Sequence, residues 1–561
     1  MEKLIDSLET LEVKIKEVKQ AQKVFSTYSQ DRIDKIFKAA AIAANQNRIL
    51  LAKMAVEETG MGVVEDKVIK NHFASEYIYN AYKDTPTCGL IEEDKTYGIK
   101  KIAEPIGVIA AVIPTTNPTS TAIFKTLIAL KTRNGIIISP HPRAKKSTIA
   151  AAKIVLEAAI QAGAPKDIIG WIDVPSLDLT NQVMREADII LATGGPGMVK
   201  AAYSSGKPAL GVGAGNVPAY VEKTCVLPRA VNDIVLSKSF DNGMICASEQ
   251  AAIVDQEIYS DFMKEIKRFH VYFVNKEEKA KLEKFMFGAE AYSDNVAQAK
   301  LNPNVVGKPA EWIAEQAGFK VPAETQIICA ECKEVGPNEP LTREKLSPVL
   351  AILKAKSTDD GIAKAAAMVE FNGLGHSAAI HTEDHEISKK FGHACKAIRI
   401  IENAPSTFGG IGSVYNAFIP SLTLGCGSYG HNSVSNNVSA VNLINIKRIG
   451  RRNNNMQWVK LPPKVYFEKN SIRYLRDMKH MEKAMIVTDR SMVNLGYVEK
   501  IEDVIRRRRN HVDIELFFDV EPDPSIDTVR EGVELMRKFE PDCIIALGGG
   551  SSMDAAKAEK T

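Results

Sequence analysis

The spacing of apolar residues divides the chain into a helical start followed by alternating strands and helices. From residue 1 to about residue 60, apolar residues recur every three to four positions, which predicts helices. After Lys101, short β-branched apolar runs alternate with helical stretches. Four strand–helix repeats in succession predict a parallel sheet covered on both faces, a doubly wound α/β domain. The expected strands are 107–113, 135–139, 168–172 and 188–192, and the expected helices are 120–131, 146–162, 179–186 and 198–205.

Three loops that follow these strands are candidate cofactor loops. Ligands of doubly wound sheets bind beyond the carboxyl ends of the strands. Small side chains in these loops would let backbone amides approach a dinucleotide. The loops read Pro114-Thr115-Thr116-Asn117-Pro118, Ser139-Pro140-His141-Pro142 and Thr193-Gly194-Gly195-Pro196-Gly197.

The remaining pattern predicts a second α/β stretch from about residue 218 to 436 and a third one after residue 464. Between them, a polar segment without periodicity ends in Pro462-Pro463, which predicts a linker over 446–463. The third stretch shows three strands, and its tail, 558–561, does not look like a continuing helix. We therefore expect an incomplete Rossmann-like domain that is loosely packed or leans on the first two. Its expected strands are 484–488, 514–518 and 543–547, with a helix start at 554–557.

Composition and charge exclude several classes of protein. With 45% hydrophobic and 25% charged residues, the chain has the composition of an ordinary globular protein. Its 72 basic and 69 acidic residues nearly cancel, so we expect no nucleic-acid partner. The basic run 506–509 is interpreted as a solvated helix face, with a phosphate-binding patch as the alternative. The sequence shows no signal peptide and no apolar span long enough to cross a membrane, and its cysteines are scattered. These features predict a cytoplasmic protein without a membrane partner.

Two glycine-rich segments differ in their context. The segment 425–430 has the literal pattern G-x-G-x-x-G, but no amphipathic helix follows it, so we assign it to a loop. Gly548-Gly549-Gly550-Ser551 follows a strand and precedes a helix start, which is the order that a phosphate-binding turn requires. A tight structural turn is the alternative. Asp489 and Glu521, near the two preceding strand ends, are candidates for holding ribose hydroxyls.

The segment 240–250 contains a candidate nucleophile. Cys246 follows the polar turn Asp241-Asn242-Gly243 and lies among small residues. An ordinary thiol is only a few per cent thiolate at pH 7, so a nucleophilic cysteine needs amide dipoles or a base beside it. Spacing alone favours a buried, inert cysteine, with a nucleophile as the alternative.

Several of these segments together resemble one family. They are similar to the bifunctional aldehyde–alcohol dehydrogenases of fermenting microbes, in which an acylating aldehyde dehydrogenase is fused to an iron-type alcohol dehydrogenase. The resemblance implies an aldehyde dehydrogenase over 1–445, with a cofactor domain at about 1–217 and a catalytic domain at about 218–436, and an alcohol dehydrogenase fragment over 464–561. The segments are EETGMG at 57–62, IPTTNP at 113–118, SPHPRA at 139–144, LATGGPG at 191–197, FDNGMICASE at 240–249 and GGGSSMDAAK at 548–557.

The resemblance also implies roles for single residues. Cys246 matches the family's nucleophile, and Asn117 matches the asparagine whose amide forms the oxyanion hole with the Cys246 backbone N–H. Glu344 matches a glutamate that contacts the nicotinamide-side ribose. His376 could take a proton from Cys246 or from an incoming thiol, with a structural histidine as the alternative. The further expected cofactor contacts are Ile113, Pro114, Thr115, Thr116, Ser139, Thr193, Gly194, Gly195 and Gly213.

One departure from hydrolytic aldehyde dehydrogenases bears on the reaction. Those enzymes carry a glutamate that activates water in the segment that matches 209–216 here, and this segment has no carboxylate. A thioester on Cys246 should therefore survive until the thiol of coenzyme A attacks it. The implied activity is an NAD-dependent, acetylating acetaldehyde dehydrogenase that also runs in reverse. A hydrolytic dehydrogenase and an inactive structural subunit are the alternatives.

By this resemblance, the alcohol dehydrogenase half is expected to be incomplete in this sequence. The family holds iron there with one aspartate and three histidines, but only His480 and His511 follow Pro463. We therefore expect no metal site and no alcohol dehydrogenase activity. The full-length family forms helical filaments, so the resemblance implies a homo-oligomer.

Overall fold

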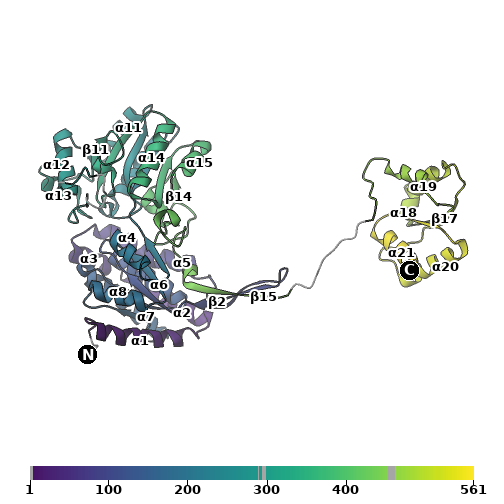
Figure 1. Ribbon diagram of the computed structural model, residues 1–561, viewed down its shortest axis with the longest axis horizontal. Coiled ribbons are helices and arrows are strands. Elements are labelled where there is room, and N and C mark those ends of the chain that lie inside the picture. The colour runs from purple at the N-terminus through teal and green to yellow at the C-terminus, as the bar shows by residue number, and fades with distance from the viewer. Residues whose placement is uncertain (1–3, 289, 294–298, 453–461, 561) are drawn as a thin grey trace. The chain divides into compact units, whose positions relative to one another are not determined.

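The computed structural model describes residues 4–288, 290–293, 299–452 and 462–560 (Figure 1). The chain forms two compact units, 1–453 and 454–561, which are described separately. None of the helices in the described ranges is long and apolar enough to cross a bilayer.

The predicted helical start is confirmed and consists of several helices. Ser7 caps the first of them, α1, in a reciprocal hydrogen-bonded box with Thr10. Val18 of α1 packs against the first sheet so closely that a Cβ on Gly135 would lie 2.8 Å from Val18 Cγ1. The helices are α1 (Leu8–Phe25), α2 (Gln30–Gln46), α3 (Arg48–Thr59), α4 (Val64–His72) and α5 (Ile78–Tyr82).

The first sheet has five parallel strands in the order β5-β4-β3-β6-β7. Ile109 and Ala111 of β3 join one apolar cluster, whereas Val108 and Ala110 join another on the opposite face. The sheet is therefore covered on both sides, which confirms the doubly wound domain; only β7 was not expected. The elements are β3 (Val108–Val112), α6 (Pro118–Lys131), β4 (Gly135–Ser139), α7 (Lys145–Gln161), β5 (Ile169–Trp171), α8 (Leu177–Glu186), β6 (Ile189–Thr193), α9 (Pro196–Tyr203) and β7 (Ala209–Val212).

The second sheet has seven parallel strands in the order β10-β11-β12-β9-β8-β13-β14, as expected for an α/β stretch. The segment 425–430 lies in a loop with a short 3-10 turn, Ser428–Gly430, as the sequence predicted. The strands are β8 (Val217–Val221), β9 (Glu249–Asp255), β10 (Val271–Phe273), β11 (Ile327–Cys332), β12 (Val349–Ala355), β13 (Gly375–His381) and β14 (Ala397–Glu402). The helices are α10 (Leu227–Ser239), α11 (Tyr259–Ile266), α12 (Lys276–Phe287), α13 (Ala310–Ala317), α14 (Thr358–Asn372), α15 (His385–Ala394) and α16 (Ser406–Ile411).

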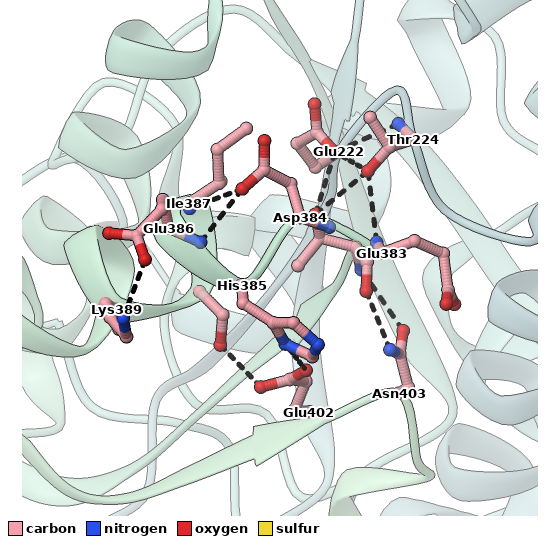
Figure 2. A network of polar contacts seen from close by, with 12 residues as sticks. Glu222, Thr224, Glu383, Asp384, His385, Glu386, Ile387, Lys389, Glu402 and Asn403 are labelled. Atoms are coloured by element: carbon pink, nitrogen blue, oxygen red, sulfur yellow. Dashed lines mark hydrogen bonds and ion pairs between the residues drawn. The ribbon is translucent and has the colours of Figure 1, made fainter.

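Polar side chains at the carboxyl ends of β8, β13 and β14 bind one another (Figure 2). Glu222 accepts hydrogen bonds from the backbone N–H of Thr224 at 2.9 Å and from the Thr382 hydroxyl at 2.8 Å. Asn403 donates to the Thr382 carbonyl at 2.7 Å, and Asp384 caps α15. These contacts hold together the loops at the carboxyl end of the second sheet.

A third, antiparallel sheet corrects the expected linker. Residues 444–450 form β15, which pairs with 99–105, so the linker does not begin at residue 446. The pairing strand is more than 300 positions away in the sequence, and local sequence patterns do not reveal a partner at that distance. Residues 453–461 of the expected linker lie outside the described part of the chain. Figure 1 shows β15 beside β2. The sheet has the order β1-β2-β15, with β1 (Gly89–Asp94), β2 (Ile99–Pro105) and β15 (Ile444–Gly450).

The second unit contains the three predicted strands in a parallel sheet ordered β17-β16-β18. Apolar clusters lie on both faces, and β16 is buried whereas β18 is half-buried. The tail is helical through Lys560, so the expectation that the helix would not continue was wrong. The elements are α17 (Tyr474–Asp477), β16 (Lys483–Thr488), α18 (Arg490–Asn494), α19 (Tyr497–Arg506), β17 (Asp513–Phe517), α20 (Ile526–Phe539), β18 (Cys543–Leu547) and α21 (Gly550–Lys560).

The basic run 506–509 is not a helix face. Helix α19 ends at Arg506, which pairs with Glu502 at 2.8 Å. Arg508 instead donates to the backbone carbonyls of Arg476 at 3.1 Å and Met478 at 2.6 Å. This arginine thus ties the segment before β16 to the end of α19.

Candidate active site

The candidate site lies where the first sheet meets the second. The carboxyl ends of β3, β6 and β7 supply loops from one side, and the segments that precede β9 and β12 supply Cys246 and Glu344 from the other. Together they enclose a cavity of about 630 Å³. Of the predicted residues, the cavity lining includes Pro114, Thr115, Thr116, Asn117, Thr193, Gly194, Gly195, Gly213, Cys246 and Glu344.

An adjoining cavity of about 350 Å³ extends along the first sheet. It shares Pro114 and the Thr193–Gly195 loop with the larger cavity and adds Ile113, Ser139 and, from α8, Leu177 and Thr180. The structure therefore brings every predicted cofactor residue of the first unit to one continuous region. His376 is the predicted residue that lines neither cavity.

A tight left-handed turn delivers Cys246 to the cavity. Asp241 and Asn242 have φ of 48° and 53°, and Gly243 has φ of 70°. A Cβ on Gly243 would lie 2.6 Å from the Ser347 carbonyl oxygen, so only glycine fits there. The turn ends just before β9, and this places Cys246 at the amino end of the second sheet.

Burial and a nearby carboxylate keep the Cys246 thiol protonated. Burial raises the pKa of Cys246 to about 12, and the charge of Glu344 adds to this increase. Arg399 and the cysteine's own backbone N–H act in the opposite direction and favour the thiolate. The sulfur therefore needs a proton acceptor, or a partner that stabilises negative charge, before it can attack.

The segment 209–216, which has no carboxylate of its own, holds Glu344 beside the cavity. Its Oε1 accepts a hydrogen bond from the backbone N–H of Gly215 at 3.0 Å, and burial raises the pKa of Glu344 to about 7. Gly215 also lies against the nucleophile loop, since a Cβ there would come within 1.9 Å of the Cys246 carbonyl oxygen. Among the described residues that line the cavity, Glu344 is the one carboxylate, and it is protonated in part near neutral pH.

We expect Glu344→Gln to increase the reactivity of Cys246 at alkaline pH. Above pH 7 the Glu344 carboxylate is ionised and raises the pKa of Cys246, so removing that charge lowers this pKa and enlarges the thiolate fraction. The rate of alkylation by iodoacetamide should rise by about two- to tenfold at pH 8 and change less at pH 6.

Glu249→Gln is the matched control for this variant. Glu249 is also buried with a pKa of about 7, but its Oε1 accepts from the Ser406 backbone N–H, and it does not contribute to the pKa shift of Cys246. Equal alkylation rates for Glu344→Gln and the unchanged protein at pH 8 would contradict the assignment.

Asn117 is the N-cap residue of helix α6 and is held by a residue that the sequence did not single out. Lys70 of α4 donates from Nζ to Asn117 Oδ1 at 2.7 Å, and it also pairs with Asp241. Lys67 pairs with the same carboxylate at 3.1 Å. Neither lysine was predicted to belong to the site; their i,i+3 spacing on a helix beside the EETGMG segment was the signal available.

His376 is completely buried at the start of β13. Its Nδ1 lies 3.1 Å from the Ser377 hydroxyl, and its Nε2 has no hydrogen-bond partner among the described residues. Burial, together with the charge of Arg399, lowers the pKa of His376 well below its usual value. The imidazole is therefore neutral at physiological pH, and the same lowering of the pKa makes it a weaker base than an ordinary histidine.

The second unit has its own cavity of about 580 Å³ at the carboxyl ends of its strands. The predicted residues Asp489, Glu521, Gly549 and Ser551 line it, with Gly548 and Gly550 in the same turn. Asp489 caps α18, and hydrogen bonds from Ser525 and Thr528 lower the pKa of Glu521. Both carboxylates thus also have local structural roles. The described ranges contain no group of three or more His, Cys, Asp or Glu residues placed to hold a metal.

The first unit is thus an α/β protein in which two parallel sheets meet at a cavity that holds Cys246. Residues 7–298 match the model of the aldehyde dehydrogenase family, and residues 462–560 match that of iron-containing alcohol dehydrogenases. The chain therefore belongs to the aldehyde dehydrogenase family.

Individual relatives agree with the resemblance seen in the sequence. The aldehyde-alcohol dehydrogenase of Streptococcus pneumoniae is 64% identical over 509 residues, which cover 90% of this chain and 58% of that protein. The succinate-semialdehyde dehydrogenase (acetylating) of Clostridium kluyveri is 40% identical over 78% of this chain and 96% of its own length. The structure of an acetylating aldehyde dehydrogenase from Geobacillus thermoglucosidasius is 46% identical and has a TM-score of 0.77. The match covers 80% of this chain and 98% of that chain. The chain spans about three fifths of the aldehyde–alcohol dehydrogenases that it matches.

Proposed function

We propose that the first unit catalyses the CoA-acylating oxidation of an aldehyde, such as acetaldehyde, to an acyl-CoA with NAD, and the reverse reaction. The observation that carries the proposal is the position of Cys246 in a cavity that also contains Asn117 and the three expected cofactor loops. Relatives named as acetylating aldehyde dehydrogenases are covered almost completely by this chain, which supports the choice of coenzyme A as acceptor.

The residues around the cavity suit a nicotinamide dinucleotide. The hydroxyl oxygens of Thr115 and Thr193 are buried beside the cavity and have no hydrogen-bond partner within the described ranges. Unpartnered buried hydroxyls are costly unless a ligand uses them. Gly195 and Gly213 leave space where a side chain would obstruct a phosphate or a ribose. A nicotinamide bound here would accept a hydride from the substrate.

The protein's own residues then perform the remaining steps. The Cys246 sulfur adds to the aldehyde carbonyl carbon, and the thiol proton passes to an acceptor, for which we propose the neutral His376. The amide N–H of Asn117 and the Cys246 backbone N–H donate to the oxygen that becomes negative. Loss of the hydride leaves a thioester on Cys246. The coenzyme A thiol attacks this thioester, forms acyl-CoA, and gives its proton to the departing Cys246 sulfur, while His376 releases the first proton to solvent.

Hydrolysis is the second candidate, and Glu344 is the observation that favours it. This carboxylate lies near enough to Cys246 to raise its pKa, and it could act as a base toward water. The hydrogen bond that Glu344 accepts from Gly215 suits a ribose-binding position as well. A related Rhodopseudomonas palustris propionaldehyde dehydrogenase structure, 26% identical, is described with bound CoA and an acylated cysteine, which supports the transfer to a thiol.

We expect NADH formation from acetaldehyde to require coenzyme A. Without coenzyme A, the acyl-enzyme has no efficient acceptor for its acyl group. Turnover should therefore be at least about 100-fold slower, because the reaction loses a nucleophile that the site binds and orients. The assay follows NADH absorbance with and without coenzyme A and identifies the product. Equal turnover to acetate without coenzyme A would establish the hydrolytic reaction instead.

For the second unit, we propose that the turn Gly548–Ser551 binds the phosphates of a dinucleotide, because it joins the carboxyl end of β18 to the first turn of α21. Residues 462–560 match part of the alcohol dehydrogenase family, and we propose no alcohol oxidation by them. We also propose that copies of the chain associate with one another, as the family resemblance implies.

A further inference from the structure

A buried cluster of charges lies directly behind Asn117. Lys67, Lys70 and Asp241 are exposed by only 2%, 4% and 0%, respectively, and Asp66 accepts a hydrogen bond from the Asp241 backbone N–H at 2.7 Å. Two cations and two carboxylates balance one another there. Buried ions are expensive to desolvate, and a cluster of this kind must therefore be held together by its mutual pairing.

The two lysines contact neighbouring residues of the loop that carries Asn117. Lys67 donates to the Thr116 backbone carbonyl at 3.1 Å, whereas Lys70 donates to the Asn117 side-chain oxygen at 2.7 Å. The Lys70 ammonium also lies 5.6 Å from the centre of the Phe240 ring, which shields it from water.

The contact with Lys70 determines which way the Asn117 amide faces. An ammonium has only donors, so it can bind only the oxygen end of an amide. Because Lys70 binds Oδ1, the amide nitrogen Nδ2 is the end of the side chain that faces the cavity. There Nδ2 donates to Thr116 Oγ1 at 3.3 Å. The positive charge also draws electron density toward Oδ1 and makes the N–H groups stronger donors.

We propose that Lys70, held in place by Asp241, is a positioning residue for the oxyanion hole: it fixes and polarises the Asn117 amide so that the amide N–H meets the developing oxyanion. This inference rests on the proposed acyl-enzyme chemistry at Cys246. The charge cluster links two parts of the site, because Asp241 belongs to the turn that delivers Cys246 and Lys70 contacts Asn117.

The test is the variant Lys70→Met. The measured quantity is the rate of NADH formation in the first turnover, with saturating acetaldehyde and coenzyme A. We expect a loss of about 10- to 100-fold, less than the roughly 100- to 1000-fold that follows deletion of an oxyanion donor. Alkylation of Cys246 by iodoacetamide displaces iodide and forms no oxyanion, so its rate should stay within about twofold. Lys131→Met is the matched control, since Lys131 is a completely buried lysine paired with Asp34 at the other end of α6.

A double-mutant cycle distinguishes positioning from a general structural role. In the background of Asn117→Ala, Lys70→Met should change the rate by less than about twofold, because the group through which it acts is gone. The same loss in both backgrounds would overturn the proposal, as would a Lys70→Met enzyme with unchanged turnover. If Lys70→Met does not fold, Asp241→Asn replaces it and should slow turnover without slowing alkylation; unchanged turnover in that variant would also overturn the proposal.

The proposed function and this inference fail in different ways. An unchanged protein without coenzyme A-dependent turnover would contradict the function itself. Normal turnover that falls on Asn117→Ala but not on Lys70→Met would contradict the role of Lys70 alone.

Discussion

Replacement of Cys246 by alanine is expected to abolish aldehyde oxidation, with a loss in kcat on the order of 10,000-fold or more. The sulfur forms the covalent bond through which the acyl group passes, and the described residues that line the cavity include no second thiol to replace it. Removal of a covalent nucleophile leaves only the small acceleration due to binding and the oxyanion hole. The measurement is NADH formation with acetaldehyde and coenzyme A, and mass spectrometry of the unchanged protein should locate an acyl adduct on Cys246 when coenzyme A is omitted.

Cys426→Ala is the matched control for this experiment. Cys426 is a buried thiol that donates to the Leu424 carbonyl at 3.4 Å and, like Cys246, interacts with Arg399. Its loss should leave most of the activity, because it does not line the cavity. An acyl adduct on Cys426, or full activity of Cys246→Ala, would disprove the assignment of the nucleophile.

The sequence pattern was sufficient to predict strands that are short, unbroken apolar runs, whether fully buried like β4 or half-buried like β18. The strands at 135–139 and 543–547 occur with the predicted bounds, since each is a short apolar run between polar turns. β7 was missed because it has only four residues and lies in a glycine-rich segment, which is too short to show the apolar pattern of a strand. β15 was assigned to the linker because its partner, β2, is distant in the sequence and supplies the hydrogen bonds that make it a strand.

The candidate site could be predicted only in the part that short motifs encode. Cys246, Asn117 and Glu344 were found through segments with a family resemblance, although spacing alone favoured an inert cysteine. The ion pair between Lys70 and Asp241 joins residues 171 positions apart, and no local pattern distinguishes a buried lysine from one on a solvated helix face. The raised pKa of Cys246 likewise depends on burial and on the Glu344 charge, which only the packed structure provides.

Replacement of Asn117 by alanine should lower kcat by about 100- to 1000-fold, equivalent to about 2.7–4 kcal/mol of transition-state stabilisation. The loss arises because the amide N–H is the side-chain donor that we assign to the oxyanion, and the Cys246 backbone N–H would remain as its partner. The KM for NAD should change little, since the effect lies in the transition state for addition and hydride loss rather than in cofactor binding. Alkylation of Cys246 by iodoacetamide should also be nearly unchanged.

Asn117→Asp separates the donor from the shape of the side chain. An aspartate has almost the same size and still accepts the hydrogen bond from Lys70, but its ionised carboxylate has no N–H and would repel a developing oxyanion. We therefore expect a loss at least as large as that of Asn117→Ala, together with a thermal unfolding midpoint close to that of the unchanged protein. Turnover of Asn117→Asp at the unchanged rate would show that the amide N–H does not stabilise the transition state, and the oxyanion would then have to be held by backbone groups alone.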